Sequence, residues 1–147
     1  MTFRETLDKH LDAIRGRDLR SLIETLPEET LTLVMSDGRL VRSVREFVEL
    51  HRGWFEQANW SLGTEIVALR ETPRMGFATI RLDYRHEPEG GVRIRQSSLL
   101  TLIFALEGDR WVMVLDQNTP IKENARGDDG QPGPSRGDRH DHPQSLG

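Results

Sequence analysis

Apolar residues recur at helical spacing in three segments near the start of the chain. The pattern predicts a first helix ending at Gly16, a short second helix from Leu19 to Leu26, and a third helix that opens after Ser43 and ends near Gln57. Capping residues stand at the three starts: Thr2 with Glu5, Asp18, and Ser43 with Glu46. The N-terminal part of the chain is therefore predicted to be mainly helical.

Two strand signals accompany these helices. Asp37-Gly38, a pair typical of tight hairpin turns, separates short segments at 30–36 and 39–42. After Trp60 the apolar period changes to two, and we expect four strands, at 60–70, 75–86, 92–106 and 110–119. Helices and a hairpin followed by a four-stranded meander predict an α+β domain, in which a curved antiparallel sheet wraps around three N-terminal helices.

The composition changes abruptly after the last expected strand. From residue 122 to residue 147 the chain is rich in Gly, Pro and charged residues and has almost no apolar side chains to bury. We therefore expect one domain, at 1–121, followed by a disordered tail at 122–147.

Charge and residue usage exclude several classes of function. Lys and Arg total 20 against 24 Asp and Glu, so the formal charge is −4 and a nucleic-acid partner is not expected. The chain has no Cys, which excludes disulfides and thiol chemistry. No apolar segment is long enough to span a bilayer and no signal peptide opens the chain, so we expect a cytoplasmic protein without a membrane partner. No His-x-x-x-His motif or Gly-rich phosphate loop is present, and neither a metal nor a cofactor is expected.

Three segments resemble those of a known superfamily. They are the end of the first helix at 13–18, the hairpin at 36–42, and the final segment at 108–118, which begins Gly-Asp-Arg-Trp. The chain resembles, over about residues 1–121, the nuclear transport factor 2-like superfamily, which includes ketosteroid isomerase-like and SnoaL-like proteins. The resemblance implies a cone-shaped α+β barrel but not one chemistry, because this architecture hosts isomerases, cyclases, dehydratases and binding modules.

Turn geometry predicts which strand residues face the concave side of the sheet. With Gly108-Asp109 as a two-residue turn, Leu100 lies opposite Gln117, so Gln117 faces inward while Asp116 and Asn118 face outward. The expected apolar pocket has these candidate residues: Tyr84, His86, Gln96, Ser98 and Gln117 from the strands, His51 and Trp54 from the third helix, and Trp60 beside it. Each of these tryptophans is also compatible with an ordinary core position.

The expected chemistry of this pocket depends on the register of the last strand. In the predicted register His51 or His86 would accept a proton near neutral pH, and Tyr84 would donate a hydrogen bond to a developing oxyanion. A one-residue slip or bulge would place Asp116 and Asn118 inside instead of Gln117. A carboxylate would then replace the histidine as the expected base.

Two functions follow as hypotheses. The first is a protein that binds a small apolar or amphipathic molecule, either for binding alone or for proton transfer of the isomerase or cyclase type. The alternative is a non-catalytic dimerisation module, because the outer sheet face carries Leu99, Ile103 and Val114 among other apolar residues. A homodimer is expected in either case.

Overall fold

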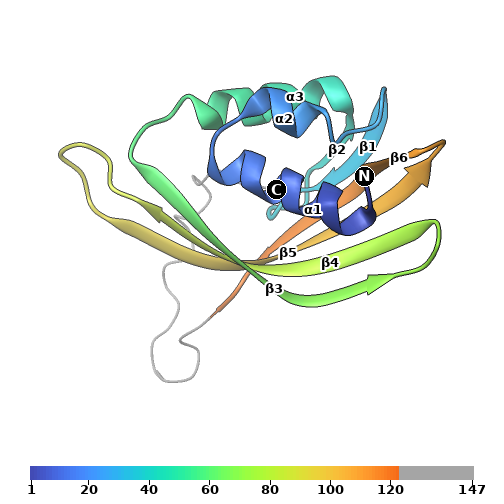
Figure 1. Ribbon diagram of the computed structural model, residues 1–147. Helices are drawn as coiled ribbons and strands as arrows, with labels where there is room; N and C mark the ends of the chain where they lie inside the picture. Colours follow the sequence, from blue (N-terminus) through green and yellow to red (C-terminus); the bar gives the residue numbers. More distant parts are fainter. Residues whose placement is uncertain (123–147) are drawn as a thin grey trace.

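The computed structural model describes residues 1–122, and the expected disordered tail therefore lies, apart from Lys122, outside the described residues (Figure 1). The elements in chain order are α1 (Phe3–Arg15), α2 (Leu19–Ile23), β1 (Thr30–Val34), β2 (Leu40–Ser43), α3 (Val44–Phe55), β3 (Trp60–Glu71), β4 (Met75–His86), β5 (Ile94–Glu107) and β6 (Arg110–Pro120). The three helices, the hairpin and the four-stranded meander are those that the sequence predicts.

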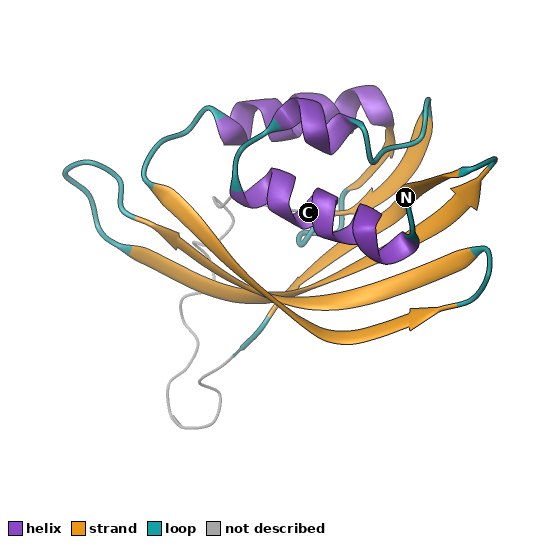
Figure 2. Ribbon diagram, in the orientation of Figure 1, coloured by secondary structure: helices purple, strands orange, loops and turns teal. Residues whose placement is uncertain are grey.

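The six strands form one curved sheet in the order β2-β1-β6-β5-β4-β3. All three helices lie on its concave side (Figure 2). The sequence predicts an antiparallel sheet, whereas the sheet here is mixed, because β1 pairs in parallel with β6. The hairpin docks on the free edge of the meander, and strand periodicity does not indicate which way a docked hairpin runs. The barrel is not closed, since β2 and β3 are its two edges.

The helices begin where their caps place them. In α1 the backbone N–H of Glu5 donates to Thr2 Oγ1 at 3.1 Å, and the Thr2 N–H donates to Glu5 Oε1 at 2.9 Å. Ser43 caps α3 by accepting from the N–H of Glu46 at 3.1 Å. These bonds satisfy backbone donors that have no partner within the helix, and they fix where each helix enters the core.

The core lies between the helices and the concave face of the sheet. Phe3 of α1 is fully buried, and its ring contacts the Phe104 ring at a centroid distance of 5.6 Å. A Cβ at Gly76 of β4 would lie 2.8 Å from the Phe3 ring, so only glycine lets the ring approach the strand this closely. This contact fixes the position of α1 over the central strands.

The register of β5 against β6 differs from the expected one because of a β-bulge. Phe104 pairs with Met113 as expected, but Ile103 pairs with Leu115, so Val114 is an extra residue in β6. From this point on the inward and outward positions of β6 are exchanged. The expectation that Gln117 faces Leu100 is therefore wrong, and Asn118 occupies that place.

The register of β4 against β5 differs by two residues from the one that the sequence predicts. The expected strands 75–86 and 92–106, joined by a loop at 87–91, would pair Arg85 with Arg93. Arg85 pairs instead with Arg95, because the loop extends to Arg93. An even shift keeps every side chain on its expected face. Tyr84 and Ser98 therefore lie on the concave side, as expected.

Candidate functional site

Asp116 is the carboxylate that the bulge turns into the interior. It lies on β6 between Leu33 of β1 and Leu102 of β5, and its exposed fraction is 0%. Neither carboxylate oxygen has a hydrogen-bond partner among the described residues. Burial raises the pKa of Asp116 well above its ordinary value, because the charged form is not solvated there. An unsatisfied carboxyl group inside a core is rare and points to a use other than packing.

Asn118 lies two residues further along β6, on the same concave side. It is 6% exposed, and its Oδ1 has no hydrogen-bond partner among the described residues. Gln117, which the sequence analysis placed in the pocket, is exposed and pairs with Thr101 on the outer face. The last strand thus contributes a carboxyl and an amide to the interior, where one glutamine was expected.

His10 is a buried polar residue that the sequence analysis did not select for the site. Its Nδ1 lies 2.8 Å from Thr25 Oγ1, and the Thr25 hydroxyl donates to the carbonyl of Leu22 at 2.7 Å. Thr25 therefore accepts from His10 Nδ1–H, and His10 Nε2 carries a lone pair with no partner among residues 1–122. Burial, and then the charge of His51, lowers the pKa of His10 to about 3, so the ring is neutral near pH 7.

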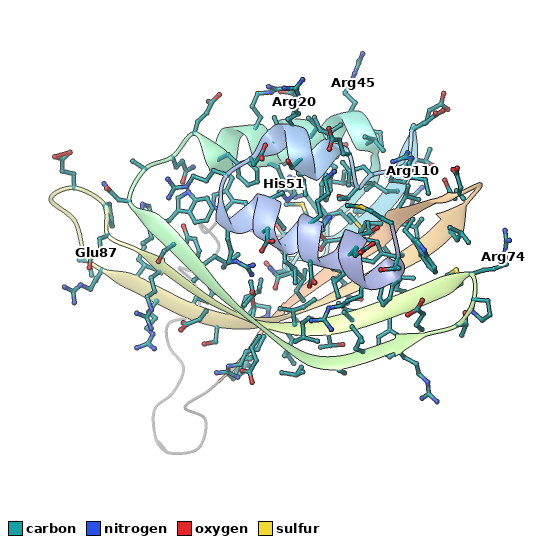
Figure 3. The ribbon with its side chains drawn as sticks, in the orientation of Figure 1. Arg20, Arg45, His51, Arg74, Glu87 and Arg110 are labelled. Carbon is teal, nitrogen blue, oxygen red and sulfur yellow. The ribbon has the colours of Figure 1, made fainter. Side chains whose placement is uncertain are left out.

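His51 of α3 occupies the interior position that its helical spacing predicts. It is fully buried between the helices and the sheet (Figure 3). Its Nδ1 donates to the carbonyl of Phe47 at 2.9 Å, and its ring stacks on that of Phe47 at a centroid distance of 4.0 Å.

Aromatic rings gather where β3 begins and β4 ends. Trp54 and Trp60 stack at a centroid distance of 4.4 Å and an interplanar angle of 16°. The indole N–H of Trp60 donates to the carbonyl of Trp54 at 3.2 Å. Tyr84 lies 6.1 Å from the Trp60 ring and 6.2 Å from the His86 ring. We call Trp54, Trp60, Tyr84 and His86 the aromatic cluster.

Tyr84 is buried in this cluster, whereas His86 is only half-buried. Burial raises the pKa of the Tyr84 hydroxyl, while the Trp54 side chain and the charge of Arg17 act in the opposite direction. Gln96 is the β5 partner of Tyr84 and is half-buried. The predicted strand residues of the pocket, Gln117 excepted, therefore share the concave side of the sheet.

The structure separates the candidate residues into two groups. Asp116 pairs with Leu102 of β5, whereas Tyr84 pairs with Gln96, six residues away along the same strand. At about 3.3 Å per residue this separation is about 20 Å of strand. Trp54 connects His51 to the rest of the aromatic cluster, since its ring is 5.9 Å from the His51 ring and 6.4 Å from the Tyr84 ring. The site thus extends along the concave face rather than converging on one point.

Residues 1–122 contain neither a cluster of metal-binding side chains nor a membrane-spanning helix. No group of three or more His, Cys, Asp or Glu side chains there is arranged to hold a metal ion. No helix of that part of the chain is both long and apolar enough to cross a membrane.

Solved structures share this arrangement of helices and strands. An NTF2-like protein of unknown function from Shewanella oneidensis matches with 18% identity and a TM-score of 0.63, over 78% of this chain and 93% of its own. A ketosteroid isomerase-like protein from Erwinia carotovora atroseptica matches with 14% identity and a TM-score of 0.67, over 80% and 92%. An LEH-like epoxide hydrolase of M. tuberculosis matches with 14% identity and a TM-score of 0.61, over 80% of each chain.

Sequence comparison adds nothing to these structural matches, since no family model and no curated protein matches the chain. At identities this low the likeness concerns the fold and not the activity. The TM-scores of 0.63 and 0.67, over 78% and 80% of this chain, show that the fold is shared. Residues 1–122 therefore have the nuclear transport factor 2-like α+β cone fold.

Proposed function

We propose that the protein binds a small apolar or amphipathic molecule on the concave side of the sheet and catalyses a proton transfer, with Asp116 as the acid–base group. The observation that carries this proposal is the fully buried carboxyl of Asp116, both of whose oxygens lack a partner among residues 1–122. A buried carboxyl group without hydrogen-bond partners destabilises the fold, and a protein retains such a group where the group has a function.

The environment of Asp116 suits this chemistry. A raised pKa makes the ionised carboxylate a stronger base and keeps the acid form available closer to neutral pH. In the proposed reaction a carboxylate oxygen takes a proton from a carbon next to a carbonyl group, and the C–H electron pair forms an enolate. Where a carbon–carbon double bond is conjugated with the enolate, the Asp116 carboxylic acid, whose proton exchanges with solvent, then protonates the far carbon, which completes an isomerisation. Asn118, on the same side of β6, is the proposed donor to the enolate oxygen.

Access to Asp116 requires motion, because its exposed fraction is 0%. A substrate would reach it when the packing between the helices and the sheet opens. His10 is a second buried acceptor, through its unpartnered Nε2. His51, Tyr84 and His86 keep the roles that the sequence analysis predicted, as competing hypotheses for the base and the donor.

The test is exchange of carbonyl-adjacent protons in deuterated water, followed by NMR with a panel of cyclic unsaturated ketones. We expect the wild-type protein to accelerate exchange for at least one ketone and Asp116→Asn to lose about a hundredfold or more of that rate. Asp109→Asn is the matched control, because Asp109 is exposed in the turn before β6. A rate that survives in Asp116→Asn but is lost in His51→Gln or His86→Gln would contradict the assignment and restore the histidine hypothesis.

We also propose a homodimer formed through the outer face of the sheet. Met75, Phe77 and Leu99 are exposed on that face by 44%, 37% and 37%, and Phe77 pairs with the half-buried Ile103. A hydrophobic strip on a sheet face is typical of a surface that a partner covers.

Sedimentation velocity tests the homodimer. We expect a dimer for the wild-type protein and monomers for Phe77→Glu and Leu99→Glu. Leu40→Glu is the control, because Leu40, at 49%, is more exposed than Phe77 and Leu99 but lies on the hairpin strand β2. A monomeric wild-type protein at micromolar concentration would contradict the proposal.

A further inference from the structure

The sheet has a long open edge along β3. This strand has 12 residues and is one of the two edge strands, and it forms the lower margin of the sheet in Figure 1. Within residues 1–122, no hydrogen bond outside the ladder with β4 reaches the backbone of residues 61–71. The other edge strand, β2, has only four residues. An edge strand presents alternate N–H and C=O groups that can pair with another strand, and β3 offers the longer row of them.

The second half of this edge carries apolar side chains in solvent. Residues 66–69 read Ile-Val-Ala-Leu, and Val67 and Leu69 are 49% and 42% exposed. Natural edge strands usually guard such a run with lysine, proline or an inward-pointing charge, and residues 66–69 contain none of these. The β3 edge is therefore a surface on which an extended strand can be added.

A β-bulge in β3 decides which of its side chains share a face. The pairing with β4 is regular up to Ile66 and resumes at Ala68, so Val67 is an extra residue in the strand. In a regular strand, residues five apart point to opposite faces. Glu65 and Arg70 are five apart, but the β4 positions opposite them, 81 and 77, are four apart and lie on the outer face. The bulge thus turns both charged side chains to the outer face.

The two halves of the bulged segment complement each other when a second copy approaches in the antiparallel direction. If Val67 of one copy lies opposite position 68 of the other, Ile66 lies opposite Leu69 and Glu65 lies opposite Arg70, on both sides of a two-fold axis. Opposed side chains then share a face: the charged pair lies on the outer face and the apolar pair on the concave side. Neither Glu65 nor Arg70 forms an ion pair among the described residues. One register therefore forms two apolar pairs and two ion pairs.

We propose that the β3 edge pairs with the β3 edge of a second copy and joins two sheets into one continuous sheet. This interface is separate from the homodimer through the outer face and does not rest on the proposed function. Both copies carry the bulge at the same place, so the twist that it adds is matched across the axis. The hairpin behind the edge is held by bonds from the Thr72 N–H to the Met75 carbonyl at 2.8 Å and from the Met75 N–H to Thr72 Oγ1 at 3.1 Å. The edge is ordered before it meets the second copy, which lowers the entropy cost of pairing.

Association through this edge depends on protein concentration. A single pair of strands covers far less than the roughly 1,200 Å² that a stable interface buries, so we expect a Kd of about 100 µM to 1 mM. At micromolar concentration the outer face alone then decides the oligomeric state. Edge pairing joins those assemblies in more concentrated solution.

Charge reversal tests the proposed register. The experiment uses the full chain carrying Leu99→Glu, which alters the outer face but not the edge, in sedimentation equilibrium from about 10 µM to about 1 mM. We expect a monomer–dimer equilibrium that Arg70→Glu or Glu65→Arg weakens at least about tenfold, because two attractive pairs become repulsive. The two reversals together restore opposite charges across the axis and should recover the affinity to within about threefold. If the outer-face homodimer survives Leu99→Glu, the same changes should appear in the step from dimer to tetramer.

Two controls separate edge pairing from effects on folding or net charge. Arg70 lies opposite Phe77 in its own sheet, so Arg70→Glu creates no repulsion within the chain and should leave Tm unchanged. Arg45→Glu makes the same change of charge on the outer side of α3 (Figure 3) and should leave the Kd within about twofold. Amide hydrogen exchange gives a readout by position: residues 65–70 should gain protection in concentrated solution, and residues 40–43 of β2 should not.

Several results would overturn the proposal. They are absence of association at about 1 mM, an unchanged Kd in Arg70→Glu, and a double variant that associates as weakly as the single ones. Open-ended oligomers would indicate that β3 pairs with β2 of the next copy, and they would also exclude the two-fold arrangement.

Discussion

Replacing Asp116 by leucine should stabilise the fold. The carboxyl is fully buried and unpartnered within residues 1–122, and its strand neighbours are Leu33 and Leu102. Removing an unsatisfied buried polar group recovers about 1–3 kcal/mol, and burying the leucine side chain adds about 2 kcal/mol. The added volume costs about 1 kcal/mol in packing strain. We therefore expect a net gain of about 2–4 kcal/mol near pH 8, a rise in Tm of roughly 8–15 °C.

The stability gained by Asp116→Leu should increase as pH rises. Because the pKa of Asp116 is raised in the folded protein, the folded state binds more protons than the unfolded state above the ordinary aspartate pKa. The contribution of Asp116 to wild-type stability is therefore fully present below that ordinary pKa and is lost as pH rises through the folded pKa. The advantage of Asp116→Leu should grow between pH 4 and pH 8.

Urea denaturation at several pH values measures this difference, with Gln117→Leu as the matched control. Gln117 is exposed on the outer face, so leucine there should change stability by less than about 0.5 kcal/mol. The reasoning would be refuted if Gln117→Leu stabilised the protein and Asp116→Leu destabilised it. That result would mean that the last strand has the unbulged register.

Two further predictions concern the core. Because the pKa of His10 is about 3 in the folded protein, the His10 contribution to wild-type stability falls as pH drops below the unfolded histidine pKa, by about 3 kcal/mol at pH 4.5. In urea denaturation at several pH values, His10→Gln should show a smaller loss of stability between pH 6.5 and pH 4.5. An equal loss in the variant would contradict this prediction. Gly76→Ala should lower the free energy of unfolding by about 1–3 kcal/mol, because its methyl group would meet the Phe3 ring. Gly53→Ala, with open space around it in α3, should raise that free energy by about 1 kcal/mol. Equal Tm shifts in the two variants would contradict the Phe3 contact.

The elements of this fold were predictable because each carries a local signal. Capping residues mark where α1 and α3 begin, and both Thr2 and Ser43 make the bonds expected of them. The turn at Gly108 joins the last two strands in the expected two residues. The parallel pairing of β1 with β6 was not predictable, because it brings together strands far apart in the sequence whose patterns record burial but not neighbours.

Which side chains of β6 point to the concave side of the sheet was not predictable for a different reason. Residues 111–115 are apolar without interruption, so no polar residue shows where alternation breaks. Asp116 and Asn118 are therefore expected inside only if the last strand slips by one residue or contains a bulge. His10 lies on the buried face of α1, but its partner Thr25 comes from a separate segment, and no spacing rule connects the two.

The bulge at Val114 decides which polar side chains of β6 reach the interior. If Val114 entered the regular ladder, Leu102 would pair with Leu115, Asp116 and Asn118 would face the convex surface, and Gln117 would face inward. If Val114 were deleted, the ladder would continue without a bulge and Asp116 would still pair with Leu102. The interior chemistry of β6 therefore depends on how the ladder accommodates this one residue. A count of residues from the turn at Gly108 gives the facing of Asp116 only when the bulge is included in it.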